Sequence, residues 1–190
     1  MKKITFKLKG VQPLMLNNPQ TVNPLNAYAK KLKPLTSKRT KTDADHEDID
    51  RIKGERGGYQ SSEGQYIIPG THFEQSLISA AKETKQGKMF ERSLNIFSDS
   101  ILHFKDENKS IEELYNAGIY VDIRCVGIKD SKITTCRAIV PDWSCEVEVL
   151  YDENQINAKD IISAMKIAGE RYGVGTYRQK YGRFEVLSHK

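Results

Sequence analysis

Regular alternation of apolar and polar residues constrains the fold of this chain more than any other feature. In residues 145–151 (CEVEVLY) the apolar side chains occupy every second position, with Glu146 and Glu148 between them. Successive side chains of a β-strand point to opposite faces of a sheet, so this spacing predicts a strand with one buried face. Residues 2–9 alternate in the same way. Such strands are typical of antiparallel sheets in which only one face is covered.

A β-hairpin is predicted within residues 119–140. Its first strand, IYVDIRCVGI, places Ile119, Val121, Ile123 and Cys125 on one face, and a polar loop over 129–132 connects it to ITTCRAIV. Short polar loops between alternating strands are typical of antiparallel partners. A short apolar strand over 66–68 and a closing strand over 183–188 (RFEVLS) complete the predicted sheet.

Helices are predicted between these strands. Thr71, followed by Glu74 three residues later, forms the pattern of a capping box at the start of a helix that reaches about residue 81. A second helix is expected over 88–97. The last helix has Asn157 as its N-cap and ends before Gly173, which is the residue type favoured just past a helix end.

The order of these elements predicts an α+β fold, with helices on one face of a mostly antiparallel sheet. Simplified, it is the βαββαβ pattern of ferredoxin-like folds, which RNA-recognition domains share. We expect a single domain over 1–190, with a long, partly mobile insertion over 17–64 in which only the piece around 24–33 is helical. The acidic run 43–50 is expected to be a loop.

The positive charge of the chain lies in two separate segments. The net charge is +5, with six cations and no acid between residues 30 and 41, and four cations and no acid between 171 and 183. Excess positive charge favours an anionic partner, above all nucleic acid. The alternative for the first segment is an ordinary solvated run of charge.

Residues 173–186 (GVGTYRQKYGRFEV) interleave glycines, cations and aromatic rings. Cations neutralise phosphates, aromatic rings stack on bases, and glycines allow close approach of backbone N–H groups. The stretch therefore indicates binding of single strands, with a plain helix cap and turn as the alternative. It is no dinucleotide-binding fingerprint, because that motif opens a helix and this stretch follows one. The predicted nucleic-acid-binding residues are Lys30, Lys31, Lys33, Lys38, Arg39, Arg171, Gly173, Gly175, Tyr177, Arg178, Lys180, Tyr181 and Arg183.

No metal site and no cofactor are predicted. The three cysteines form no CxxC pair, which indicates reduced thiols in a cytoplasmic protein, and the acidic run 43–50 lacks the EF-hand pattern. No run approaches the roughly 18 apolar residues of a membrane span, so no membrane contact is expected. His72 is the histidine best placed to act as the general base of a metal-independent ribonuclease, and a structural role is its alternative.

Two stretches resemble a known superfamily. Residues 67–81 (IIPGTHFEQSLISAA) look like the strand–Pro-Gly–helix element of the RAMP superfamily, the ferredoxin-like RNA-binding proteins of CRISPR systems, and 168–186 look like its glycine-rich loop. The C-terminal half is also similar to a family of phage and prophage proteins. These resemblances imply an RNA-recognition-like fold and nucleic-acid binding, and leave 17–64 unmatched. The loop has fewer glycines than is typical of RAMP proteins. The phage-type pattern is carried by Arg137, Pro141, Trp143, Gly173, Gly175, Arg178, Gly182, Arg183 and Phe184.

Three functions follow as hypotheses. The first is a non-catalytic protein of a phage or mobile element, in the host cytoplasm, that binds single-stranded RNA or DNA with the 173–183 loop, uses the basic insertion as a clamp and assembles along the strand. The second is a metal-independent endoribonuclease on the same fold, with His72 as its base. The third is a protein-interaction module that inhibits a host or CRISPR-like complex.

Overall fold

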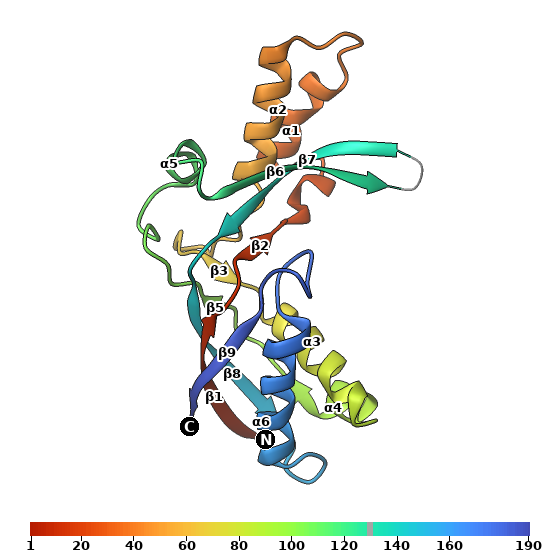
Figure 1. The fold of residues 1–190 in the computed structure, drawn as a ribbon, viewed down its shortest axis with the longest axis vertical. Coiled ribbons are helices and arrows are strands. Elements are labelled where there is room, and N and C mark those ends of the chain that lie inside the picture. The colour runs from red at the N-terminus through yellow and green to blue at the C-terminus, as the bar shows by residue number, and fades with distance from the viewer. Residues whose placement is uncertain (129–130) are drawn as a thin grey trace. The chain divides into compact units, whose positions relative to one another are not determined.

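The computed structural model describes residues 1–128 and 131–190, and these form two compact units (Figure 1). Unit 1 consists of Met1–Met15, Gln60–Glu107 and Pro141–Lys190, and unit 2 of Leu16–Tyr59 and Asn108–Val140. Most of the predicted insertion therefore packs with a later segment of the chain in unit 2. The interpretation of residues 1–190 as one domain with a partly mobile insertion stays a prediction.

Unit 1 is built on a four-stranded antiparallel sheet in the order β4-β8-β1-β9. The register pairs Phe6 with Val147 and Ile4 with Val149, and these apolar side chains are buried. The predicted alternation of both strands is therefore confirmed. The strands are β1 (Lys2–Gly10), β4 (Leu94–Asn95), β8 (Ser144–Tyr151) and β9 (Phe184–His189), with a small pair β3 (Ile67–Ile68) and β5 (Ser100–Ile101) beside them in the unit, and β2 (Leu14–Leu16) follows β1.

The helices of unit 1 bury their apolar stripes against one another and the sheet. Phe73 of α3 meets Phe184 of β9 edge-on, with ring centroids 6.1 Å apart, and Met165 of α6 is fully buried. Asn157 caps α6 as predicted, accepting a hydrogen bond from the backbone of Asp160 at 2.9 Å. The helices are α3 (Gly70–Glu83), α4 (Gly87–Ser93) and α6 (Ala158–Ile167), which continues into a π-helical turn over Ala168–Tyr172.

Two predicted helix boundaries in unit 1 are wrong. Thr71 is not an N-cap: α3 already begins at Gly70, and the N-cap residue is Pro69, whose own side chain makes no capping hydrogen bond. The carboxylate of Asp99 instead accepts the Gly70 N–H at 3.1 Å, a long-range contact that local sequence does not reveal. The helix expected over 88–97 ends at Ser93, because the next two residues pair with β8 as β4.

Unit 2 contains the predicted hairpin, which is confirmed as an antiparallel pair with Cys125 opposite Thr134. Residues 129–130 of its predicted loop lie outside the described residues. The apolar face of the first strand is largely uncovered, with Ile123 55% exposed, whereas Tyr120 and Cys136 are buried. The elements are α1 (Ala27–Thr36), α2 (Asp43–Glu55), α5 (Ile111–Asn116), β6 (Val121–Ile128), β7 (Ser131–Val140) and a 3₁₀ turn over Pro19–Val22.

The acidic run 43–50, expected to be a loop, is the first half of α2. Thr42 and Asp45 form a reciprocal capping box at its start, and Ile49 and Ile52 are buried. The helical spacing of the few apolar residues is difficult to recognise among so many acidic ones. Carboxylates near a helix N-terminus are favourable because they interact with the positive end of the helix dipole. The helical piece predicted around 24–33 is confirmed as α1. No helix in the described part of the chain is long and apolar enough to cross a membrane.

Candidate nucleic-acid-binding site

The glycine-rich loop of unit 1 is bonded to the segment that follows β1. After the π-helical turn, the backbone N–H of Thr176 donates to Met15 O at 2.8 Å, and that of Gly182 donates to Pro13 O at 2.8 Å. The two arms of the loop also join each other, since the N–H of Val174 donates to Gly182 O at 3.0 Å. Both arms are thus fixed before the tip begins.

Two glycines make this attachment possible. Gly182 has φ +72°, and a Cβ atom there would overlap the carbonyl oxygen of Val174. Gly175 has φ +82°, and a Cβ atom there would overlap Met15 O. Positive φ and close backbone approach are both conditions that only glycine meets without strain. Gly173 is buried and its N–H bonds to Ala168 O, so this predicted site residue shapes the loop from within.

The loop tip, residues 177–181, presents the predicted aromatic and basic side chains. Arg178 and Tyr181 form an isolated β-bridge across it, and the Tyr177 and Tyr181 rings are stacked with centroids 5.7 Å apart and 24° between their planes. Lys180 Nζ lies 5.9 Å from the centre of the Tyr177 ring. The side chains of Arg178 and Lys180 are exposed. The tip therefore offers a pair of rings flanked by cations.

The backbone of the tip is held in a rare conformation. Tyr177 has φ +55° and Gln179 has φ +72°, in the left-handed region that non-glycine residues seldom occupy. Such residues cost about 1–3 kcal/mol each and persist where the surroundings enforce them. Residues in such conformations cluster at binding and active sites, so this backbone is consistent with a binding role for the tip.

The pKa of His72, near the start of α3, is affected by the charge of the tip. Burial and, after it, the positive charge of Arg178 lower the pKa of His72, and Asp99 partly opposes them. The structure therefore brings together His72 and Arg178, which lie more than a hundred residues apart in the sequence. A lowered pKa keeps the imidazole neutral near pH 7, the form that accepts a proton.

The remaining predicted cations of the loop lie apart from the tip. Arg171 forms an ion pair with Glu83 of α3 at 2.5 Å, and Tyr172 donates to the same carboxylate at 2.9 Å. That hydrogen bond is the main cause of the raised pKa of Tyr172. Arg183 lines an open cavity of about 470 Å³ that contains Lys166 and none of the tip residues. Glu83 was missed by sequence reasoning, since no local pattern links it to Arg171.

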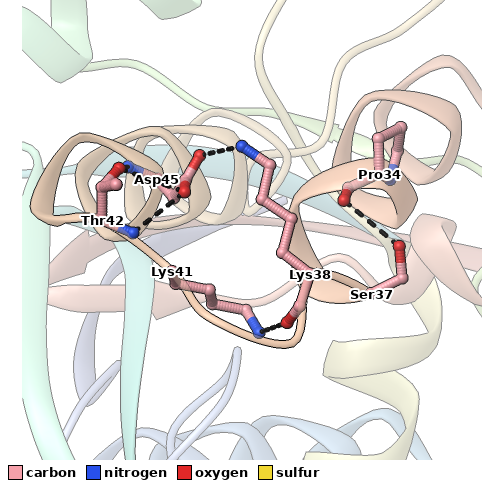
Figure 2. A network of polar contacts seen from close by, with 6 residues as sticks. All are labelled: Pro34, Ser37, Lys38, Lys41, Thr42 and Asp45. Carbon is pink, nitrogen blue, oxygen red and sulfur yellow. Dashed lines mark hydrogen bonds and ion pairs between the residues drawn. The ribbon is translucent and has the colours of Figure 1, made fainter.

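The second basic segment belongs to unit 2 and is partly engaged within it. Figure 2 shows Lys38 reaching across to Asp45, with Nζ 2.5 Å from Oδ1, while Lys41 donates to the backbone oxygen of Lys38 at 2.8 Å. The bond from Lys38, followed by that from the Thr42 backbone, lowers the pKa of Asp45 to about 2. Lys38, one of the predicted binding residues, therefore ties the α1–α2 connection together.

The other predicted cations of this segment are exposed. Lys31 lies with Nζ 5.9 Å from the centre of the Tyr28 ring, and its charge acts on the carboxylate of Glu55. Within the described residues, Lys30, Lys33 and Arg39 form no ion pair. The loop tip belongs to unit 1 and this basic segment to unit 2, so they are two separate surfaces.

Comparison with known proteins gives structural likeness without sequence likeness. No family description and no curated protein matches the sequence. A chain in the cryo-EM structure of the Type III-B Cmr-beta bound to cognate target RNA matches with a TM-score of 0.59 at 11% identity. The crystal structure of Cmr6 from Pyrococcus furiosus matches with a TM-score of 0.39 at 14% identity, over 98% of each chain.

The likeness to the Cmr-beta chain concerns the fold. It covers 99% of this chain and 59% of that one, so the protein spans about three fifths of the neighbour's length. The predicted α+β, ferredoxin-like architecture is confirmed. The resemblance to phage and prophage proteins stays a prediction. The chain thus shares its fold with a chain of the Type III-B Cmr-beta structure, at an identity that shows common architecture only.

Proposed function

We propose that this protein binds single-stranded RNA through the loop tip, residues 177–181, without cleaving it. The observation that carries the proposal is the stacked pair Tyr177 and Tyr181 with Arg178 and Lys180 beside it. Bases stack on aromatic rings, at about 1–3 kcal/mol per base, while cations hold the adjoining phosphates. Because both arms of the loop are bonded to the segment after β1, binding orders few additional groups.

The choice of RNA rests on the fold. The Cmr-beta chain that this protein resembles comes from a complex whose structure contains cognate target RNA. Fold alone does not establish function, so the likeness supports RNA only together with the rings and cations of the tip. DNA of the same sequence is the comparison that tests the preference, since the 2′-hydroxyl distinguishes the two.

The basic segment of unit 2 extends the proposal. Lys30, Lys33 and Arg39 are exposed and without ion pairs among the described residues, so we propose that they act as a clamp on the phosphates of a single strand, as a surface of unit 2 in its own right. We also propose that several copies assemble along one strand, as expected for a protein of a phage or mobile element that coats nucleic acid. Sedimentation with strands of increasing length tests this, because the number of copies bound should rise with length.

Fluorescence anisotropy with a labelled unstructured RNA tests the tip. Arg178→Ala with Lys180→Ala should weaken binding about tenfold or more and reduce the salt dependence by about 0.7 for each phosphate that is no longer neutralised. Lys88→Ala with Lys159→Ala is the matched control: it removes the same charge from exposed positions at the starts of α4 and α6. Equally weakened binding in both variants would mean that only net charge matters, and the tip would not be the site.

One observation favours a second candidate, a metal-independent endoribonuclease. His72 is kept neutral by burial and by Arg178, which pairs a proton acceptor with a cation that can stabilise a phosphorane. Incubation of labelled hairpin RNA in EDTA decides between the candidates. Cleavage that disappears in His72→Ala, with binding intact, supports the enzyme; uncut RNA with full binding supports the non-catalytic role.

A further inference from the structure

Unit 2 encloses a small cavity between the C-terminal end of α2 and strand β7. Its volume is about 170 Å³, and its polar lining comes from Asn17, Lys53, Arg56, Thr134, Thr135 and Arg137. We call it the α2–β7 cavity. This is well above the roughly 10–15 Å³ that a cavity needs to hold one water. It lies entirely within unit 2 and includes no residue of the loop tip.

The charge of this lining is entirely positive. Lys53, Arg56 and Arg137 contribute three cations, and no carboxylate is among the lining residues. The nearby acids have other partners or positions: Asp122 pairs with Arg124, and Asp50, whose charge reaches Cys136, does not line the cavity. Three cations without a carboxylate in the lining make a site that attracts an anion.

The strongest indication of an anion site is a buried hydrogen-bond donor of Arg56. One end of its guanidinium donates to the backbone oxygen of Asn18, but its Nε is buried and has no hydrogen-bond partner among the described residues. Burial lowers the pKa of Arg56, and the groups that oppose this effect are Cys136 and Tyr59, both neutral near pH 7. A buried donor of a charged group that lacks an acceptor is costly.

The neighbouring groups suit a tetrahedral oxyanion. Lys53 carries an ammonium without an ion pair in the described chain. The hydroxyls of Thr134 and Thr135 already have partners, since Thr134 Oγ1 lies 3.9 Å from Cys125 Sγ and Thr135 Oγ1 donates to Arg124 O at 3.4 Å. Asn17, which also lines the cavity, has a buried Oδ1 without a partner, and rotating the amide by 180° places the NH₂ donor at that position instead. A guanidinium, an ammonium and an amide are donors that phosphate groups receive in proteins.

We propose that the α2–β7 cavity is a binding site for a phosphate group, held by Arg56 and Lys53. The ligand is either a free phosphate monoester or one phosphodiester of a nucleic-acid backbone, since both present the same oxygens to these donors. The site belongs to unit 2 and does not depend on the role proposed for the loop tip.

Titration of the whole protein with inorganic phosphate, against sodium chloride at equal ionic strength, tests the site. Phosphate should raise the melting temperature with saturation, and the NMR signal of the Arg56 Nε–H should shift with the same midpoint. Lys53→Gln should reduce the phosphate affinity roughly tenfold or more. Arg56→Lys, which shortens the donor set of the buried guanidinium, should also weaken phosphate binding. Because the Lys53 ammonium forms no ion pair within the described chain, Lys53→Gln keeps the test valid even if Arg56→Lys misfolds.

Arg51→Gln is the matched control, since Arg51 lies on the same helix and outside the cavity. It should leave the phosphate midpoint unchanged. An abasic oligonucleotide distinguishes the two sources: competition with phosphate for the Arg56 signal identifies a backbone phosphodiester, and its absence identifies a free monoester. No difference between phosphate and chloride, or equally weakened binding in Lys53→Gln and Arg51→Gln, would overturn the proposal. The variant Arg178→Ala should still bind phosphate here, even if the tip binds no RNA.

Discussion

Tyr177 and Tyr181 stack on each other across a five-residue tip, with ring centroids 5.7 Å apart and an angle of 24° between them. Arg178 and Tyr181 form a β-bridge across the tip, and Tyr177 adopts φ +55°. Tyr177 remains 44% exposed although it is stacked. The two rings are thus already stacked on each other, and under the proposed function we expect a base to stack on Tyr177.

Replacing Tyr177 should therefore affect binding more than folding. Tyr177→Ala is expected to lower the affinity for single-stranded RNA by about 1–3 kcal/mol, the range for removal of one stacked base. Tyr177→Phe keeps the ring and should bind nearly as the wild type does. Anisotropy titrations measure the affinities, and thermal melting checks that both variants stay folded. Weak binding by the phenylalanine variant would show that the hydroxyl, and not stacking, matters.

The attachment of the loop should fail when Gly182 is replaced. Gly182→Ala combines an unfavourable positive φ with overlap onto Val174 O, so we expect the free energy of unfolding to fall by about 2 kcal/mol or more. Gly58→Ala is the control, because φ there is not positive and a Cβ atom meets nothing within 4 Å. Denaturant unfolding measures both; similar stabilities would mean that the loop adapts easily.

Removing the charge of Arg178 should change the pKa of His72. Arg178→Ala removes a positive charge that disfavours the imidazolium, so the pKa of His72 should rise. RNA bound at the tip should raise it too, because phosphates stabilise the protonated form. NMR titration of the imidazole C–H signals measures both shifts, with His46 in unit 2 as an internal reference. If the pKa of His72 changed neither in Arg178→Ala nor on RNA binding, His72 would not be electrostatically coupled to the tip.

The start of α2 should weaken in acid. Folding lowers the pKa of Asp45 from 3.8 to about 2, chiefly through the bond from Lys38, so the unfolded chain takes up the proton first. The stabilisation is complete above about pH 4 and disappears as the pH falls toward 2. Asp45→Asn should remove this part of the pH dependence of stability. Far-ultraviolet circular dichroism as a function of pH measures the loss of helix. Asp43→Asn, an exposed neighbour in the same turn, should leave it in place.

The elements predicted best were those whose signals are local. The alternation of residues 2–9 and 145–151 and the N-cap Asn157 correspond to β1, β8 and the start of α6. The predictions that failed depend on contacts with distant residues. Thr71 is not the N-cap because Asp99 fixes the start of α3. The acidic residues of α2 predict a loop when only the sequence is considered. They form a helix because Ile49 and Ile52 are buried against residues from elsewhere in the chain.

The sequence alone determined the order of strands and helices and the clustering of glycines, rings and cations after the last helix. Residue spacing and composition carry that information because strand and helix periodicity act between neighbours. Only the tertiary structure decided what each cluster member does. It stacks Tyr177 on Tyr181, assigns Arg171 to Glu83 and Lys38 to Asp45, and leaves Arg56 Nε buried without a partner among the described residues. Whether a cation is engaged within the fold or available to a ligand depends on which acids the fold brings within reach.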